Sequence, residues 1–195
     1  MYDRKKEELA DFVTRIKEQD MGARLPDLPV DIEVGGIRLK GLLANVYEEG
    51  ILLTRSASCK GRDLLHLWLH GLLAGMLLGE GKRVVAVLRD QDLRCPTAAG
   101  SRPDLSRFIE IFQAGCRSVS PLYVEPAWAY AQQLARKSAV PPLVKAREKF
   151  QDSLEKGYEK EWSLLLQGMP VADVIGEDFE ELCRTVFCPI WEAIG

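Results

Sequence analysis

A short basic segment between two apolar stretches carries the residues of this chain that are best suited to binding chemistry. The segment lies within GILLTRSASCKGRDLLHLWLHGLL, where a predicted strand is followed by a loop and an apolar helix. This order is typical of enzymes that handle phosphates, and cationic side chains in such a loop can contact phosphates. With two cations from the preceding predicted strand, the candidate DNA-binding residues are Arg38, Lys40, Arg55, Lys60 and Arg62. The alternative is a solvated loop without a ligand.

Paired carboxylates and imidazoles raise the question of a metal site. Asp31 and Glu33 share one face of a predicted strand, and two such carboxylates can bind a divalent cation. The alternative interpretation is the solvent-exposed face of an edge strand. His66 and His70 lie one helical turn apart, but a zinc-protease helix requires glutamate directly after the first histidine, where Leu67 stands. We therefore expect both histidines at the polar edge of a packed helix, and no metal site.

Other catalytic arrangements are missing from the sequence. It contains no G-x-x-x-x-G-K-[ST] loop, no convincing G-x-G-x-x-G fingerprint and no Ser-His-Asp spacing. Cys183 and Cys188 lack zinc-site spacing and neighbouring histidines, so we expect core thiols. The tryptophans occupy core-like helical positions rather than a base-stacking platform. The sequence therefore predicts no catalytic residue and no cofactor.

Composition and charge indicate a folded protein with two kinds of surface. The 195 residues are 47% hydrophobic and 28% charged, which fits one domain or one domain plus an appendage. Residues 36–150 carry 17 basic and 10 acidic side chains, whereas residues 151–195 carry 3 basic and 10 acidic ones. These net charges of +7 and -7 indicate surfaces with different partners, or an ordinary uneven distribution. An odd number of cysteines without a C-x-x-C pair indicates free thiols in a reducing cytoplasm. The longest apolar run, within 64–78, is too interrupted to span a membrane.

The first half of the chain changes its hydrophobic period several times. An amphipathic stripe predicts a helix over 3–19, and strict alternation in VDIEV predicts a strand over 30–34. Gly35-Gly36 is a hairpin turn, so IRLKGLLANVY over 37–47 and ILLTR over 51–55 complete an antiparallel three-stranded meander.

In the next predicted helix and strand, apolar and polar residues alternate less, and a larger share of the residues is apolar. The segment 62–78 is apolar almost all round, which predicts a buried helix across the sheet. KRVVAVLR is a β-branched run, which predicts a fourth strand covered on both faces. Helices are expected near 104–116, 125–137 and 142–156 and over most of the C-terminal segment, interrupted by Pro170 and Pro189. The fold class is therefore α/β, or α+β, with several C-terminal helices.

A meander, a helix and a fourth strand form the core order of the PD-(D/E)XK nucleases, the restriction-endonuclease-like fold, and this sequence resembles it. That family carries an aspartate on its second strand and an acid-x-lysine triplet on its third, which bind the catalytic metal. Here IRLKGLLANV contains no carboxylate, and Thr54, Arg55 and Ser56 stand near the triplet. The resemblance therefore implies an inactive nuclease core.

A nuclease core without its acids resembles the C-terminal domain of RecC, the gamma subunit of exodeoxyribonuclease V. The similar stretches are LPVDIEVGGIRLKGLL, LLHLWLHGLL, VKAREKF, EKEWSLLL and FCPIWEAI. The resemblance implies an N-terminal helix over residues 1–24 and the RecC-like domain over 25–195. It also implies a non-catalytic, cytoplasmic domain that docks RecB-like and RecD-like subunits and guides DNA in double-strand break repair.

Two other hypotheses remain open at this point. One is an active metal-dependent nuclease that uses Asp31, Glu33 or Asp63. The other is a protein-docking module without DNA contact. Nuclease activity with magnesium or manganese would favour the first, and DNA affinity that is indifferent to loss of Arg55 and Lys60 would favour the second.

Overall fold

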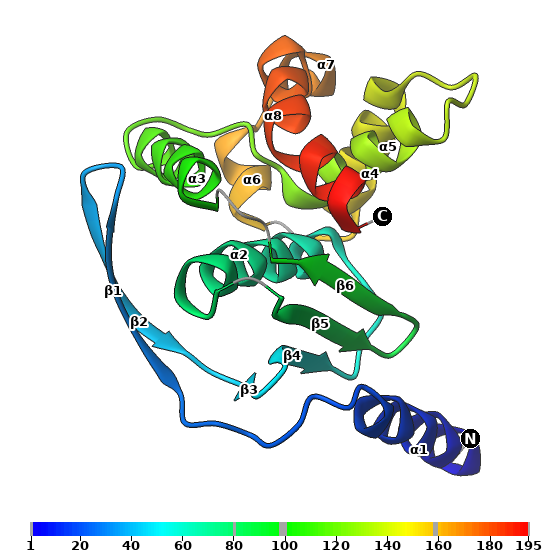
Figure 1. Cartoon of the computed structure of the whole chain (residues 1–195). Helices are drawn as coiled ribbons and strands as arrows, with labels where there is room; N and C mark the ends of the chain where they lie inside the picture. Colours follow the sequence, from blue (N-terminus) through cyan, green and yellow to red (C-terminus); the bar gives the residue numbers. More distant parts are fainter. Residues whose placement is uncertain (1, 80, 98–100, 158–159, 195) are drawn as a thin grey trace. The chain divides into compact units, whose positions relative to one another are not determined.

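The computed structural model describes residues 2–79, 81–97, 101–157 and 160–194 (Figure 1). The chain divides into two compact units, which we describe separately. Unit 1 comprises Met1–Cys59, His66–Ser118 and Ile194, and unit 2 comprises Lys60–Leu65, Val119–Ala193 and Gly195. Strands of both orientations and many C-terminal helices confirm the predicted α+β class. Among the described residues, no helix is both long and hydrophobic enough to cross a bilayer.

Unit 1 is built around a four-stranded sheet in the order β3-β4-β5-β6. Its strands are β3 (Val46–Tyr47), β4 (Gly50–Arg55), β5 (Arg83–Leu88) and β6 (Asp92–Pro96). The pair β4 and β5 is parallel, and the two outer pairs are antiparallel. Helix α2 (Gly61–Leu77) connects β4 to β5, because parallel neighbours require a crossover connection.

Two helices of the chain cover opposite faces of this sheet (Figure 1). Leu67 and Ala74 of α2 pack with alternate sheet residues, including Val84. On the other face, Phe12 of α1 (Tyr2–Glu18) packs with the intervening residues, including Val85. Every residue of β5 from Val84 to Leu88 is buried, which confirms a strand covered on both faces. Helices α1 and α2 were predicted close to their observed bounds.

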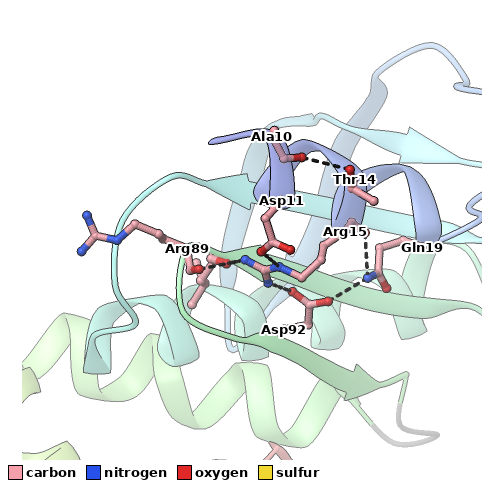
Figure 2. A network of polar contacts seen from close by, with 8 residues as sticks. Ala10, Asp11, Thr14, Arg15, Gln19, Arg89 and Asp92 are labelled. Carbon is pink, nitrogen blue, oxygen red and sulfur yellow. Dashed lines mark hydrogen bonds and ion pairs between the residues drawn. The ribbon is translucent and has the colours of Figure 1, made fainter. Parts of the chain in front are cut away.

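Arg15 joins helix α1 to the turn between β5 and β6 (Figure 2). Its Nη1 donates to Asp92 Oδ1 at 2.5 Å, and its Nη2 donates to the carbonyls of Leu88 and Arg89, each at 2.8 Å. Its Nε donates to Asp11 Oδ2 at 3.2 Å, within the helix. One guanidinium therefore binds one acceptor in its own helix and three acceptors in and around the β5–β6 turn.

The hairpin of β1 (Leu28–Val34) and β2 (Ile37–Leu43) matches the predicted turn and alternation. Gly35 and Gly36 both have positive φ, +58° and +72°, as a two-residue type I′ turn requires. Val30 and Val34 are buried, and the residues between them alternate in exposure. The side chains of the hairpin's apolar face pack with Leu72 of α2 and with α3 (Ser101–Gly115).

The predicted three-stranded meander is wrong in its pairing. β1 and β2 form a separate two-stranded sheet, and the predicted strand over 37–47 is two strands that belong to different sheets. The extended conformation is interrupted at Asn45, which adopts a left-handed conformation with φ of +58°. Only β3, after the break, pairs with β4. Arg38 and Lys40 consequently do not lie on the strand adjacent to Arg55.

Two further details differ from the sequence prediction. Strand β6 was not predicted, because its sequence DLRCP has charged residues and a terminal proline rather than a β-branched run. Helix α8 (Glu177–Ile194) continues through Pro189 instead of stopping there. Buried Phe187 and Ile190 on either side of this exposed proline hold the last turns in place by packing, which offsets the lost backbone hydrogen bond.

Unit 2 contains the remaining helices. They are α4 (Val124–Ala135), α5 (Pro142–Glu155), α6 (Lys160–Leu165), α7 (Val171–Val174) and α8. Tyr123 centres an aromatic cluster, with ring centroids 4.7 Å from Phe150 and 4.8 Å from Trp162. Buried Tyr130 of α4 donates its Oη to Glu180 Oε1 of α8 at 2.7 Å, which lowers the pKa of that carboxyl.

Candidate nucleic-acid interface

Arg38 and Lys40 lie on the exposed face of the β1–β2 hairpin. In the register of the hairpin, Asp31 stands opposite Lys40, and Glu33 stands opposite Arg38. Arg38 reaches diagonally to Asp31, with Nε–Oδ1 at 2.6 Å and Nη2–Oδ2 at 2.7 Å. This bond raises the pKa of Arg38 and gives the carboxylate a cationic partner. The hairpin therefore presents two exposed cations, of which Arg38 is ion-paired with Asp31.

The first part of the basic loop, residues 55–59, is bonded to the turn after β5. Arg55 donates its Nη2 to the carbonyl of Ser58 at 2.7 Å, and Arg89 donates its Nη2 to Ser58 Oγ at 2.6 Å. Asp90 Oδ1 accepts from the amide of Cys59 at 2.9 Å. Arg89 and Asp90 were not among the predicted site residues, although a charged pair directly after a buried strand was a signal available in the sequence.

The second part of the loop leads into the first turn of α2, which belongs to unit 2. Glu125 of α4 accepts the amide of Gly61 at 3.1 Å on Oε2 and the amide of Arg62 at 3.4 Å on Oε1. Asp63 Oδ2 accepts the amide of Lys60 at 2.8 Å, within the same turn. Free amides at a helix start are what a phosphate would bind, and here carboxylates bind them. The first amides of α2 therefore already have protein acceptors, so any phosphate contact at this loop would depend on its cationic side chains.

Gly61 allows this close approach of α2 to α4. A Cβ at this position would lie 2.8 Å from the Cβ of Trp128 and 2.9 Å from the carbonyl oxygen of Val124. Both distances are shorter than a side-chain carbon tolerates. Only glycine at residue 61 therefore lets the first amides of α2 come within hydrogen-bonding distance of the Glu125 carboxylate. No local sequence pattern could have indicated Glu125, because it lies 64 residues from Gly61 along the chain.

We expect Glu125→Ala to lower the free energy of unfolding by about 1 kcal/mol, since two first-turn amides of α2 would lose their protein acceptor. Urea unfolding measures this difference. Glu181→Ala, at an exposed carboxylate of α8, is the matched control and should leave stability almost unchanged. Equal stability of the two variants would contradict a capping role for Glu125.

The two histidines that raised the question of a metal site contact each other. His70 Nδ1 lies 2.9 Å from the carbonyl oxygen of His66, and burial lowers the pKa of His70. His66 is exposed and the two rings contact edge to face, as expected at the polar edge of a packed helix. Within the described ranges, no three or more His, Cys, Asp or Glu side chains are grouped so that they could bind a metal ion.

The comparison with known families adds the deciding observation. A family model, the RecC C-terminal domain, matches residues 1–135. The chain belongs to this family. The RecC-family match covers α1 to α4, including the hairpin, the four-stranded sheet and the Glu125 cap, and it does not extend over α5 to α8. No curated protein matches the chain. All five predicted DNA-binding residues lie within the matched residues 1–135.

Proposed function

We propose that this chain is a non-catalytic domain of RecC, the gamma subunit of the exodeoxyribonuclease V helicase-nuclease. In this role it docks RecB-like and RecD-like subunits and guides DNA during double-strand break repair and recombination. The observation that carries the proposal is the RecC-family match over residues 1–135. The charge distribution supports it, since the basic segment 36–150 suits DNA and the acidic segment 151–195 would repel phosphates.

The absence of nuclease activity is a separate part of this proposal. Neither β4 (GILLTR) nor its antiparallel neighbour β3 (VY) carries a carboxylate, and β2 (IRLKGLL) of the separate hairpin carries none either. An active PD-(D/E)XK core would need acids on its second and third strands. Two acids that the nuclease alternative would use already have structural roles. Asp31 is ion-paired with Arg38, and Asp63 accepts the Lys60 amide.

A nuclease assay tests this part directly. The chain is incubated with single- and double-stranded DNA in magnesium or manganese, with a chelator control. We expect no cleavage under any of these conditions. Cleavage that the chelator abolishes and that Asp31→Ala removes would replace this proposal with the active-nuclease alternative.

DNA guidance predicts a specific change in salt dependence. Within the described ranges, the side chains of Lys40 and Arg62 are exposed and form no hydrogen bond or ion pair, so both are available for phosphates. We expect Lys40→Ala with Arg62→Ala to weaken DNA binding by the assembled complex and to reduce its log–log salt slope by about one per lost contact. Filter binding over a salt titration measures both quantities.

Lys17→Ala is the matched control, because Lys17 is an exposed lysine outside the basic segment. It should leave the salt slope unchanged. If the double variant behaves like this control, the domain docks protein without contacting DNA through these residues.

A further inference from the structure

A groove lies between α4 and α8 on the surface of unit 2. Figure 1 shows the course of these two helices. Its volume is about 460 Å³. One wall is α4 and the other is the last part of α8. The lining residues are Ala131, Leu134, Ala135, Cys188, Trp191 and Glu192.

The two walls differ in chemistry. The α4 wall is aliphatic, with Leu134 beside two alanines, so part of it offers apolar surface close to the helix backbone. The α8 wall offers an indole, a thiol and a carboxylate. Trp191 is oriented by Trp128, whose ring centroid lies 4.8 Å away at an interplanar angle of 50°. Among the residues that the structure describes, none forms an ion pair with exposed Glu192.

We propose that this groove binds an arginine side chain that a sister subunit presents. The aliphatic part of an arginine would cover Leu134 and the α4 alanines, as long cationic side chains do on apolar surfaces. Its planar guanidinium would stack on Trp191 and pair with Glu192, two contacts that arginine makes better than lysine. An apolar side chain would fill the same volume but would leave the Glu192 carboxylate desolvated and unpaired.

The charge of the C-terminal segment supports a cationic occupant. The segment 151–195, which supplies the α8 wall, has a net charge of -7. Arg184, one turn before Cys188, is already bonded to Glu180 at 2.8 Å, so it does not neutralise Glu192. A partner surface rich in arginine would therefore be attracted to this side of unit 2. This inference rests on the proposed docking function and names the chemistry of the contact.

The test is a charge reversal in the reconstituted complex. We expect Glu192→Lys to weaken binding of the sister subunit that supplies the arginine by about tenfold, because it replaces an attraction with a repulsion. Folding should be retained, since Glu192 is exposed and a lysine in the last turn of α8 complements the helix dipole. Glu181→Lys, with the same charge change at another exposed site on α8, is the matched control and should bind like the unchanged protein.

A second measurement locates the contact. Cys188 is a half-buried free thiol in the groove, whereas Cys116 is an exposed thiol in unit 1. Complex formation should slow alkylation of Cys188 relative to Cys116, as read by mass spectrometry. The groove proposal is overturned if Glu192→Lys binds the sister subunit as tightly as the unchanged chain does and complex formation leaves the alkylation rate of Cys188 unchanged. The docking function would stand in that case, because the complex still forms. If the unchanged chain binds neither sister subunit, docking itself fails.

Discussion

A Gly50→Ala variant is expected to lose about 3 kcal/mol or more of unfolding free energy. A Cβ at residue 50 would overlap the carbonyl oxygen of Arg83 and lie 2.8 Å from its amide nitrogen. Gly50 also has φ of +140°, which side-chain-bearing residues rarely adopt. Gly50 and Arg83 are the first residue pair of β4 and β5, the two central strands of the sheet. The added methyl group would therefore push these two strands apart at this end.

Urea unfolding followed by circular dichroism measures this loss. Gly41→Ala is the matched control, since Gly41 lies in β2 with ordinary φ and has open space around its would-be Cβ. The control should change stability by less than about 1 kcal/mol. A Gly50→Ala protein as stable as the control would show that β4 and β5 can separate at this end without cost.

The second large effect is expected from Arg15→Ala. This change removes the guanidinium that binds Asp11, Asp92 and the carbonyls of Leu88 and Arg89 (Figure 2). We expect a loss of about 2 kcal/mol, because several charge-assisted bonds of a mostly buried side chain disappear together. The loss should be concentrated in α1, so amide hydrogen exchange in this helix should accelerate more than in the sheet.

Lys17→Ala provides the comparison for this experiment, because it removes an exposed cation from the same helix and no tertiary bond. Arg15→Lys should restore only part of the stability, since an ammonium group cannot bind acceptors in the planar geometry of arginine. Unchanged exchange in α1 of the Arg15→Ala protein would mean that Phe12 packing alone holds the helix on the sheet.

The sequence predicted those parts of the fold that local patterns determine. Alternation in VDIEV and the Gly35-Gly36 turn gave the β1–β2 hairpin, and the apolar run of KRVVAVLR gave the doubly covered strand β5. Local patterns do not determine which hairpin joins which sheet. The break at Asn45 separates β2 from β3, but an isolated asparagine inside an apolar stretch is a weak signal.

The candidate site shows the same division between local and distant information. The sequence alone identified the five candidate cations and the two carboxylates, Asp31 and Glu33, on the strand that pairs with Arg38 and Lys40. Their partners were harder to predict, because the Arg38–Asp31 bond depends on the hairpin register and the amides of α2 depend on Glu125 from a distant helix. A loop that resembled an open phosphate site therefore contains its own carboxylate acceptor.

The two-stranded sheet of β1 and β2 has a consequence for self-association. A hairpin that is not extended by a third strand within the described part of the chain has two open edges, each able to template strand addition from another molecule. Pro29 removes one donor from the β1 edge, and the charged residues that alternate along both strands disfavour an apolar stack. The charged side chains of β1 and β2, which include two of the candidate DNA-binding residues, thus also disfavour intermolecular β-aggregation.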